Sequence, residues 1–216
     1  MVQKSKSSVI GREELAKTYA VIKNCIPGHT YFMISDFHWE KEFPKAWPYE
    51  TKDEIDTVDS IAKWYSSDPD TGRVEVAKAN VTNVIFSSRY KGEKYNIYDI
   101  EGGMHPSAYH LVRTSPASQF VAIMNDINGK RYWINGSDMF DRDMPQLLPY
   151  EEKNEKEMAN KIADTYAMNE QTGDIYLVMV NIVKSTKSFS EVKRPRRSII
   201  ASCTTKKKGN KDESGE

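Results

Sequence analysis

Short β-prone runs separated by turn signals occupy most of the chain between residues 29 and 183, and this pattern constrains the fold more than any other feature. Asn128-Gly129 lies between two of these runs and is typical of a type I′ hairpin turn, which needs positive φ at both central residues. Many mostly antiparallel strands are therefore expected. The runs rich in β-branched and aromatic residues are His29–Ser35, Arg73–Val76, Val81–Phe86, Ala108–Arg113, Phe120–Met124, Arg131–Ile134 and Ile175–Val183.

Three further segments have the apolar spacing of amphipathic helices. They are Gly11–Cys25, Thr51–Tyr65 and Glu151–Met168. In the first, Leu15, Tyr19 and Ile22 would share one face, and the second opens on a capping box, Thr51-Lys-Asp-Glu54. Strands clustered between helical segments predict an α+β fold: a single domain of short, mostly antiparallel strands and two or three helices. We find no internal repeat and no interdomain linker in the sequence.

The charge distribution changes abruptly after Val192. Lys and Arg balance Asp and Glu at 31 each, yet the segment from Lys193 to Lys211 contains cations and no acid. Its basic residues include Lys193, Arg194, Arg196, Arg197, Lys206, Lys207 and Lys208. A stretch with so little apolar content is predicted to be disordered. The expected organisation is a flexible N-terminus at residues 1–10, a globular domain at 11–192 and a disordered basic tail at 193–216.

The sequence does not contain the spacings that usually carry chemistry. His105 and His110 are five residues apart, but neither a Cys-x-x-Cys nor a His-Glu-x-x-His pattern is present. Cys25 and Cys203 are predicted to be free thiols, because a secreted domain of this size usually carries more cysteines. Nucleophile elbows and phosphate-binding loops are also absent from the sequence. We therefore expect no catalytic, metal or cofactor site, and no apolar run is long enough to predict a membrane partner.

The basic tail leaves several interpretations open. Its cations suit contacts with nucleic-acid phosphates, but they equally resemble a nuclear-localisation signal or a solvated terminus. Aromatic residues interleaved with Lys and Arg, as around Tyr90 and Trp133, suit base stacking or packing across strands. The body outside the tail is mildly acidic, which favours packing over nucleic-acid contact there.

One aromatic segment carries a family resemblance. In Arg89-Tyr-Lys-Gly-Glu-Lys-Tyr-Asn-Ile-Tyr-Asp99, the core Gly92-x-x-Tyr95-x-x-Tyr98-Asp99 resembles a signature of baseplate wedge proteins from contractile-tailed, T4-like bacteriophages. The order of an opening strand, a Trp/Pro-rich loop, a helix and a strand before the signature also fits, so the resemblance covers about residues 29–183. The chain departs from the pattern at Tyr90, where a Trp is expected, and in the helix Glu151–Met168 and the tail, which have no counterpart.

This resemblance implies a virion structural protein rather than an enzyme. Such a protein would be assembled in the host cytoplasm and reside in the virion, bound to other tail and baseplate subunits. Tyr and Trp are favoured anchors at protein interfaces, and the candidates here are Trp39, Trp47, Tyr95 and Tyr98. The alternative is a nucleic-acid-binding accessory protein that uses the basic tail.

Overall fold

The protein is described by a computed structural model that covers residues 14–35, 38–68, 70–88, 90–94, 113, 115–135 and 138–190. These residues form two helices and a ten-stranded antiparallel sheet, which confirms the α+β class. The elements are β1 (Thr18–Ile26), β2 (His29–Ser35), β3 (His38–Glu40), β4 (Trp47–Pro48), α1 (Lys52–Ser66), β5 (Arg73–Ser88), β6 (Gln119–Ile127), β7 (Lys130–Asn135), β8 (Asp138–Asp141), β9 (Leu148–Pro149), α2 (Lys153–Ala167) and β10 (Asp174–Phe189).

The element order shows that the chain is an internal duplication. Four strands, a helix and a long strand occur twice, first over residues 18–88 (repeat 1) and then over residues 119–189 (repeat 2). Five of the six pairs of equivalent elements begin 101 residues apart. For example, α1 begins at Lys52 and α2 at Lys153, while β5 begins at Arg73 and β10 at Asp174. The prediction that the sequence contains no internal repeat is therefore wrong.

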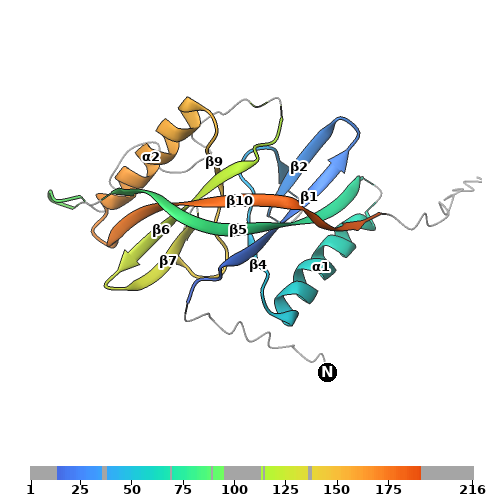
Figure 1. Cartoon of the computed structure of the whole chain (residues 1–216), viewed down its shortest axis with the longest axis horizontal. Helices are drawn as coiled ribbons and strands as arrows, with labels where there is room; N and C mark the ends of the chain where they lie inside the picture. Colours follow the sequence, from blue (N-terminus) through green and yellow to red (C-terminus); the bar gives the residue numbers. More distant parts are fainter. Residues whose placement is uncertain are drawn as a thin grey trace, which may run out of the picture.

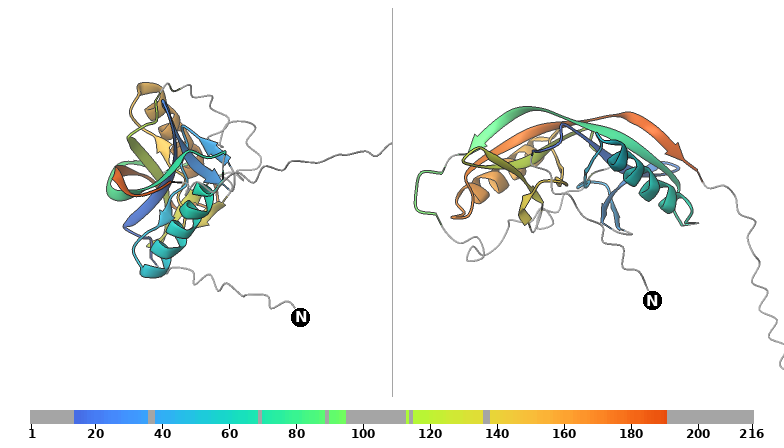
Figure 2. Two further views of the ribbon diagram at one scale, coloured as in Figure 1. Left: turned by 90° about the vertical axis from the view of Figure 1, so that its right-hand side faces the viewer. Right: turned by 90° about the horizontal axis from the view of Figure 1, so that it is seen from below.

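The strands β5 and β10 join the two repeats into one sheet of order β3-β2-β1-β5-β10-β6-β7-β8. Each is 16 residues long, which corrects the prediction of two short strands, Arg73–Val76 and Val81–Phe86, in this part of repeat 1. The first half of β5 pairs with β1, and β10 runs antiparallel along the whole of β5. Both strands cross the molecule lengthwise (Figure 1) and form an arch with α1 and α2 beneath its two ends (Figure 2).

The apolar core has three parts that follow the duplication. One cluster packs α1 against repeat 1, and a second packs α2 against repeat 2. The third contains residues of both repeats and lies between them. Within it, the rings of Tyr19 and Trp133 meet edge to face with centroids 6.0 Å apart, and the equivalent rings of Phe120 and Phe32 meet at 5.7 Å. Each repeat therefore completes the core of the other.

The segment predicted as the first helix, Gly11–Cys25, is instead strand β1 over its described second half. Tyr19, Ala20, Val21 and Ile22 are all fully buried, because β1 is covered on both faces. A strand buried on both faces loses the apolar–polar alternation that identifies most strands. The helical spacing of Leu15, Tyr19 and Ile22 was therefore a coincidence within a continuous apolar run.

Local signals were more reliable at turns and helix ends. Asn128 (φ 54°) and Gly129 (φ 86°) form the predicted hairpin turn between β6 and β7, and Gly28 (φ 80°) lies at the equivalent turn of repeat 1. The capping box at Thr51 is present, with its hydroxyl accepting from the backbone N–H of Glu54 and the Glu54 carboxylate accepting in return. The predicted third helix, Glu151–Met168, corresponds to α2.

Candidate functional site

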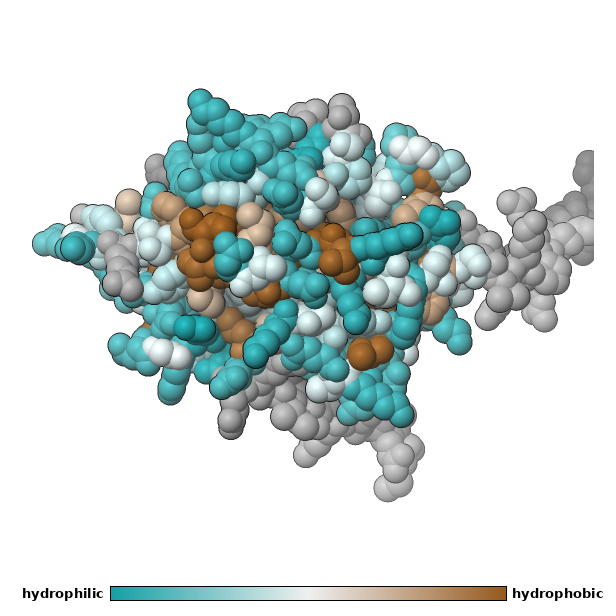
Figure 3. All heavy atoms as spheres, viewed as in Figure 1, coloured by the Kyte–Doolittle hydropathy of each residue, from teal (hydrophilic) through white to brown (hydrophobic). Residues whose placement is uncertain are grey.

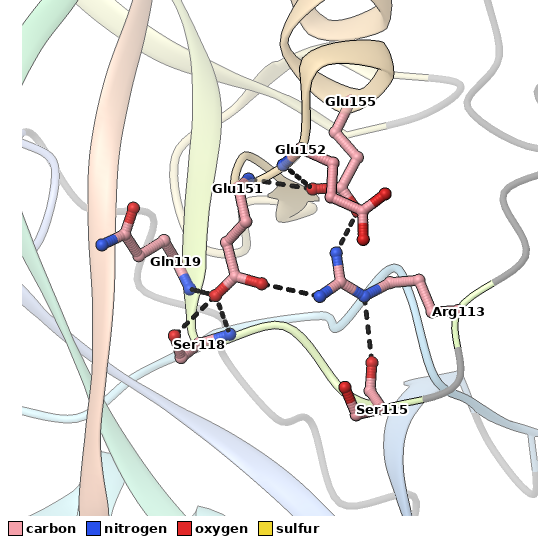
Figure 4. Close-up of polar contacts among 7 residues, drawn as sticks. All are labelled: Arg113, Ser115, Ser118, Gln119, Glu151, Glu152 and Glu155. Atoms are coloured by element: carbon pink, nitrogen blue, oxygen red, sulfur yellow. Dashed lines mark hydrogen bonds and ion pairs between the residues drawn. The ribbon is translucent and has the colours of Figure 1, made fainter.

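A cluster of charged side chains holds the start of repeat 2 (Figure 4). The guanidinium of Arg113 lies between two carboxylates and pairs with Glu151 at 2.6 Å and also with Glu155. Its Nε donates to the backbone carbonyl of Ser115 at 3.0 Å. The Arg113 side chain is 7% exposed and that of Glu155 only 1%. An ion pair so deeply buried is sensitive to the loss of either partner.

Glu151 connects this cluster to the first residues of β6. One of its oxygens accepts from the backbone N–H and hydroxyl of Ser118 at 2.8 and 2.6 Å and from the N–H of Gln119 at 3.1 Å. Burial alone would raise the pKa of Glu151, but the hydrogen bonds from Ser118, Arg113 and Gln119 outweigh it and lower the pKa from 4.5 to about 2. The Glu151 carboxylate is therefore charged and held by these hydrogen bonds, so it is not available for proton transfer.

Repeat 1 contains the same backbone anchor. The Glu50 carboxylate accepts from the N–H groups of Lys17 and Thr18 at 2.7 and 3.0 Å, and Glu54 accepts from Glu50 and Thr51 at the helix start. In the sequence, Arg12 stands 101 residues before Arg113, but it lies outside the described residues. An anchor that occurs once in each repeat belongs to the frame of the fold, and we assign the charged cluster a structural role.

The low pKa of Glu151 predicts an acid-dependent loss of stability. Because the pKa is lower in the folded than in the unfolded state, its contribution is present above pH 4.5 and is lost as the pH falls through 4.5 toward about 2. With the side chain 28% exposed, solvent screening limits the contribution to about 1–3 kcal/mol. Urea unfolding at pH 7 and pH 3 is expected to show a smaller acid-induced loss for Glu151→Gln than for the wild type. An equal loss in both proteins would contradict the assignment.

A hollow of about 810 Å³, here called hollow 2, lies at the β1–β2 turn of repeat 1. Its lining includes Cys25, His29 and Lys41, together with Arg73 and Glu75, which form an ion pair at 2.7 Å. Burial and the nearby carboxylate of Glu75 raise the pKa of the Cys25 thiol. A thiol held in its protonated form is a poor nucleophile, so the Cys25 thiol is not activated for covalent catalysis.

A second hollow, of about 730 Å³ and here called hollow 1, lies at the equivalent hairpin of repeat 2. Its lining comes from the residues that precede β1, from β5 beyond its ladder with β1, from the β6–β7 hairpin and from β10. The two hollows share equivalent positions, since Gly129, Lys130 and Arg131 of hollow 1 stand 101 residues after Gly28, His29 and Thr30 of hollow 2. The lining of hollow 1 is Glu14, Leu15, Ala16, Lys17, Val81, Thr82, Val84, Met124, Gly129, Lys130, Arg131, Trp133 and Val178.

Hollow 1 combines an apolar floor with a mostly cationic rim. Leu15, Val81, Val84, Met124 and Val178 belong to the floor, and hydrophobic side chains gather on this face of the molecule over β5, β10 and β6 (Figure 3). Val84 is 49% exposed. Apolar surface left open beside a polar rim is typical of a protein-binding site.

The rim of hollow 1 carries charged residues, and its lining has no exposed aromatic ring. Lys17, Lys130 and Arg131 surround the floor, opposed by Glu14, and Arg131 is paired with Asp126 at 3.2 Å. Trp133 is only 1% exposed, so its ring has no free face on which a base could stack. Across the described part of the chain, no group of three or more His, Cys, Asp and Glu side chains could hold a metal ion. Hollow 1 thus offers apolar contact surface and rim charges.

Of the predicted anchor residues, Trp39 and Trp47 are described by the structure, and neither lines hollow 1. Trp39 in β3 is half-buried and packs edge-on against Tyr65 of α1 at 5.4 Å, and Trp47 in β4 packs on the same α1 cluster. Tyr95 and Tyr98 lie outside the described residues, as do His105, His110 and the basic tail from Lys193. The interface and nucleic-acid assignments for these residues remain predictions.

Sequence reasoning missed the residues of hollow 1, although a signal for the duplication was present. Pro48-Tyr-Glu-x-Lys-x-Glu54 recurs as Pro149-Tyr-Glu-x-Lys-x-Glu155, and Thr71-Gly72 recurs as Thr172-Gly173. Both pairs of matching segments are 101 residues apart. The same offset, applied to the rest of the sequence, places the two hairpins and their hollows at equivalent positions. Neither α1 nor α2, the helices of the described residues, is long and apolar enough to cross a membrane. Comparison with family models, curated proteins and solved structures finds no match for this chain.

Proposed function

We propose that this chain is a non-catalytic structural protein that acts through contacts with other proteins, as a virion component of the kind implied by the baseplate resemblance. The observation that supports it is hollow 1, which has apolar residues of β5, β6 and β10 in its lining. Contiguous apolar surface that is exposed beside polar residues often marks a protein interaction site. The polar groups beside it are rim charges that suit recognition rather than proton or group transfer.

The duplicated frame supports the same proposal. A single sheet spans both repeats, and a shared core cluster joins them. Surfaces at opposite ends of such a sheet keep a fixed relative position, which a bridging subunit needs in order to set the spacing of its neighbours. The alternative, nucleic-acid binding, rests on the basic tail alone, because hollow 1 lacks an exposed stacking ring.

Quantitative mass spectrometry of purified virus particles from the source of the chain tests this function. The protein is expected in the particle at a fixed ratio to other tail subunits. A Val84→Asp variant places a charge on the apolar floor of hollow 1, so its incorporation is expected to fall at least about tenfold. Val183→Asp is the matched control, since Val183 is a 38% exposed valine of β10 outside both hollows.

Two results would contradict the proposal. If the wild-type chain is absent from particles yet abundant in infected cells, the structural role fails. If Val84→Asp enters particles as efficiently as the wild type and Val183→Asp, hollow 1 is not the surface that the particle contacts.

A further inference from the structure

The strand β5 has an open edge beside hollow 1. Its pairing with β1 ends at Asn80 and Thr18, followed by one last backbone bond from the N–H of Val81 to the carbonyl of Lys17 at 3.1 Å. From Thr82 to Ser88, the strand pairs only with β10 as far as the described residues extend. One row of backbone donors and acceptors along this segment therefore has no strand partner within the described part of the chain, and such a row is a template for strand addition.

The duplication creates a second open edge, but the two edges are protected differently. The equivalent segment of β10, Val183–Phe189, pairs with β5 alone among the described residues and carries Lys184 and Lys187. Lysines on an edge strand discourage pairing with another chain. The segment Thr82–Ser88 contains no charged residue and no proline, and its Val84 is 49% exposed. Of the two edges, only that of β5 lacks the features that block strand addition.

We propose that β5 accepts an extended segment of a partner protein as an added antiparallel or parallel strand along Thr82–Ser88. Alternate side chains of an added strand point to one face, so its apolar residues enter hollow 1 while its backbone pairs with the edge of β5. This inference rests on the proposed function, because it specifies the partner that the structural protein holds at hollow 1.

The charges around hollow 1 select the chemistry of the added segment. Lys17 and Lys130 are exposed and have no ion-pair partner among the described residues, whereas Arg131 is already paired with Asp126. The rim carries three cations against the single acid Glu14. The fitting segment therefore alternates apolar residues with Asp or Glu, and acidic side chains at its ends lie near Lys17 and Lys130.

The same charges argue against a second copy of this chain as the occupant. A second copy that paired its own uncharged β5 edge here would bring Lys17, Lys130 and Arg131 of its rim toward the same three cations of the first copy. Like charges brought together in this way disfavour the contact. Hollow 2 is also unsuited to a second partner strand, because its lining includes the Arg73–Glu75 ion pair and no residue of β10. One partner segment per chain is therefore expected.

A synthetic peptide tests the inference with the full-length protein. The probe is an 11-residue, end-capped, fluorescein-labelled peptide of alternating valine and aspartate, and the control peptide has lysine in place of aspartate. Fluorescence anisotropy is expected to show saturable 1:1 binding of the acidic peptide only. Val84→Asp and Lys130→Glu should each weaken this binding at least about tenfold, whereas Val183→Asp should leave it unchanged. Circular dichroism checks that all three variants are folded.

Hydrogen–deuterium exchange with and without the peptide tests the binding mode. Strand addition predicts new protection of backbone amides within Thr82–Ser88. Failure of the acidic peptide to bind, equal binding of the lysine peptide, or protection confined to another segment would overturn the inference. The inference and the proposed function fail separately: a chain present in particles that does not bind the peptide retains its structural role without strand addition. A chain that binds the peptide yet is absent from particles keeps the edge site and loses the virion role.

Discussion

Replacement of Arg113 by alanine is expected to lower the free energy of unfolding by about 3–5 kcal/mol. The substitution leaves the Glu155 carboxylate, whose side chain is 1% exposed, without its counter-charge in the interior. It also removes the bond from Arg113 to Glu151, which helps to hold the start of β6. Urea unfolding at pH 7, monitored by circular dichroism, measures the effect.

Two comparisons separate the buried charge from a general effect of losing an arginine. Arg73→Ala breaks an ion pair in which the arginine is 60% exposed, and it should lower stability by less than about 1 kcal/mol. Arg113→Met combined with Glu155→Gln removes both charges while glutamine keeps an acceptor oxygen for the helix start. This double variant should recover more than half of the loss. If it is no more stable than Arg113→Ala, the uncompensated carboxylate is not the cause.

Replacement of Trp133 by alanine is expected to lower the free energy of unfolding by a similar amount, about 3–5 kcal/mol. Trp133 belongs to repeat 2 and is 1% exposed, and it lies in the cluster that both repeats share. Its indole N–H donates to the hydroxyl of Tyr19 in repeat 1 at 2.7 Å. Truncation therefore leaves a cavity at the junction of the repeats and removes a buried hydrogen bond between them.

Because this cluster joins the two repeats, Trp133→Ala is expected to destabilise them together. Hydrogen exchange should show faster opening of amides in β1 and in β6 to the same extent. Trp64→Ala makes the same substitution on the surface of α1, where the side chain is 56% exposed, and should change stability by less than about 1 kcal/mol. Loss of protection in β6 alone, with β1 unchanged, would show that the repeats unfold independently.

The features that the sequence determined by itself are those set by neighbouring residues. The Thr51–Glu54 capping box starts α1 because its hydrogen bonds span three residues, and Asn128-Gly129 makes the hairpin turn because both residues tolerate positive φ. The strand His29–Ser35 was likewise predicted with the bounds of β2. Local backbone preference is sufficient at such positions, so the sequence pattern alone predicts them.

Burial by distant residues decided the rest. Thr18–Ile26 is a strand because β2 and β5 pair with its two edges and apolar clusters cover both of its faces. Because both faces are buried, the sequence lacks the apolar–polar alternation that identifies most strands. The length of β5 depends on its pairing with β10, which begins about a hundred residues later in the chain. Hollow 1 exists only because segments of both repeats meet around it. The sequence near Val84 does not predict this hollow, because the residues that line it come together only in the tertiary structure.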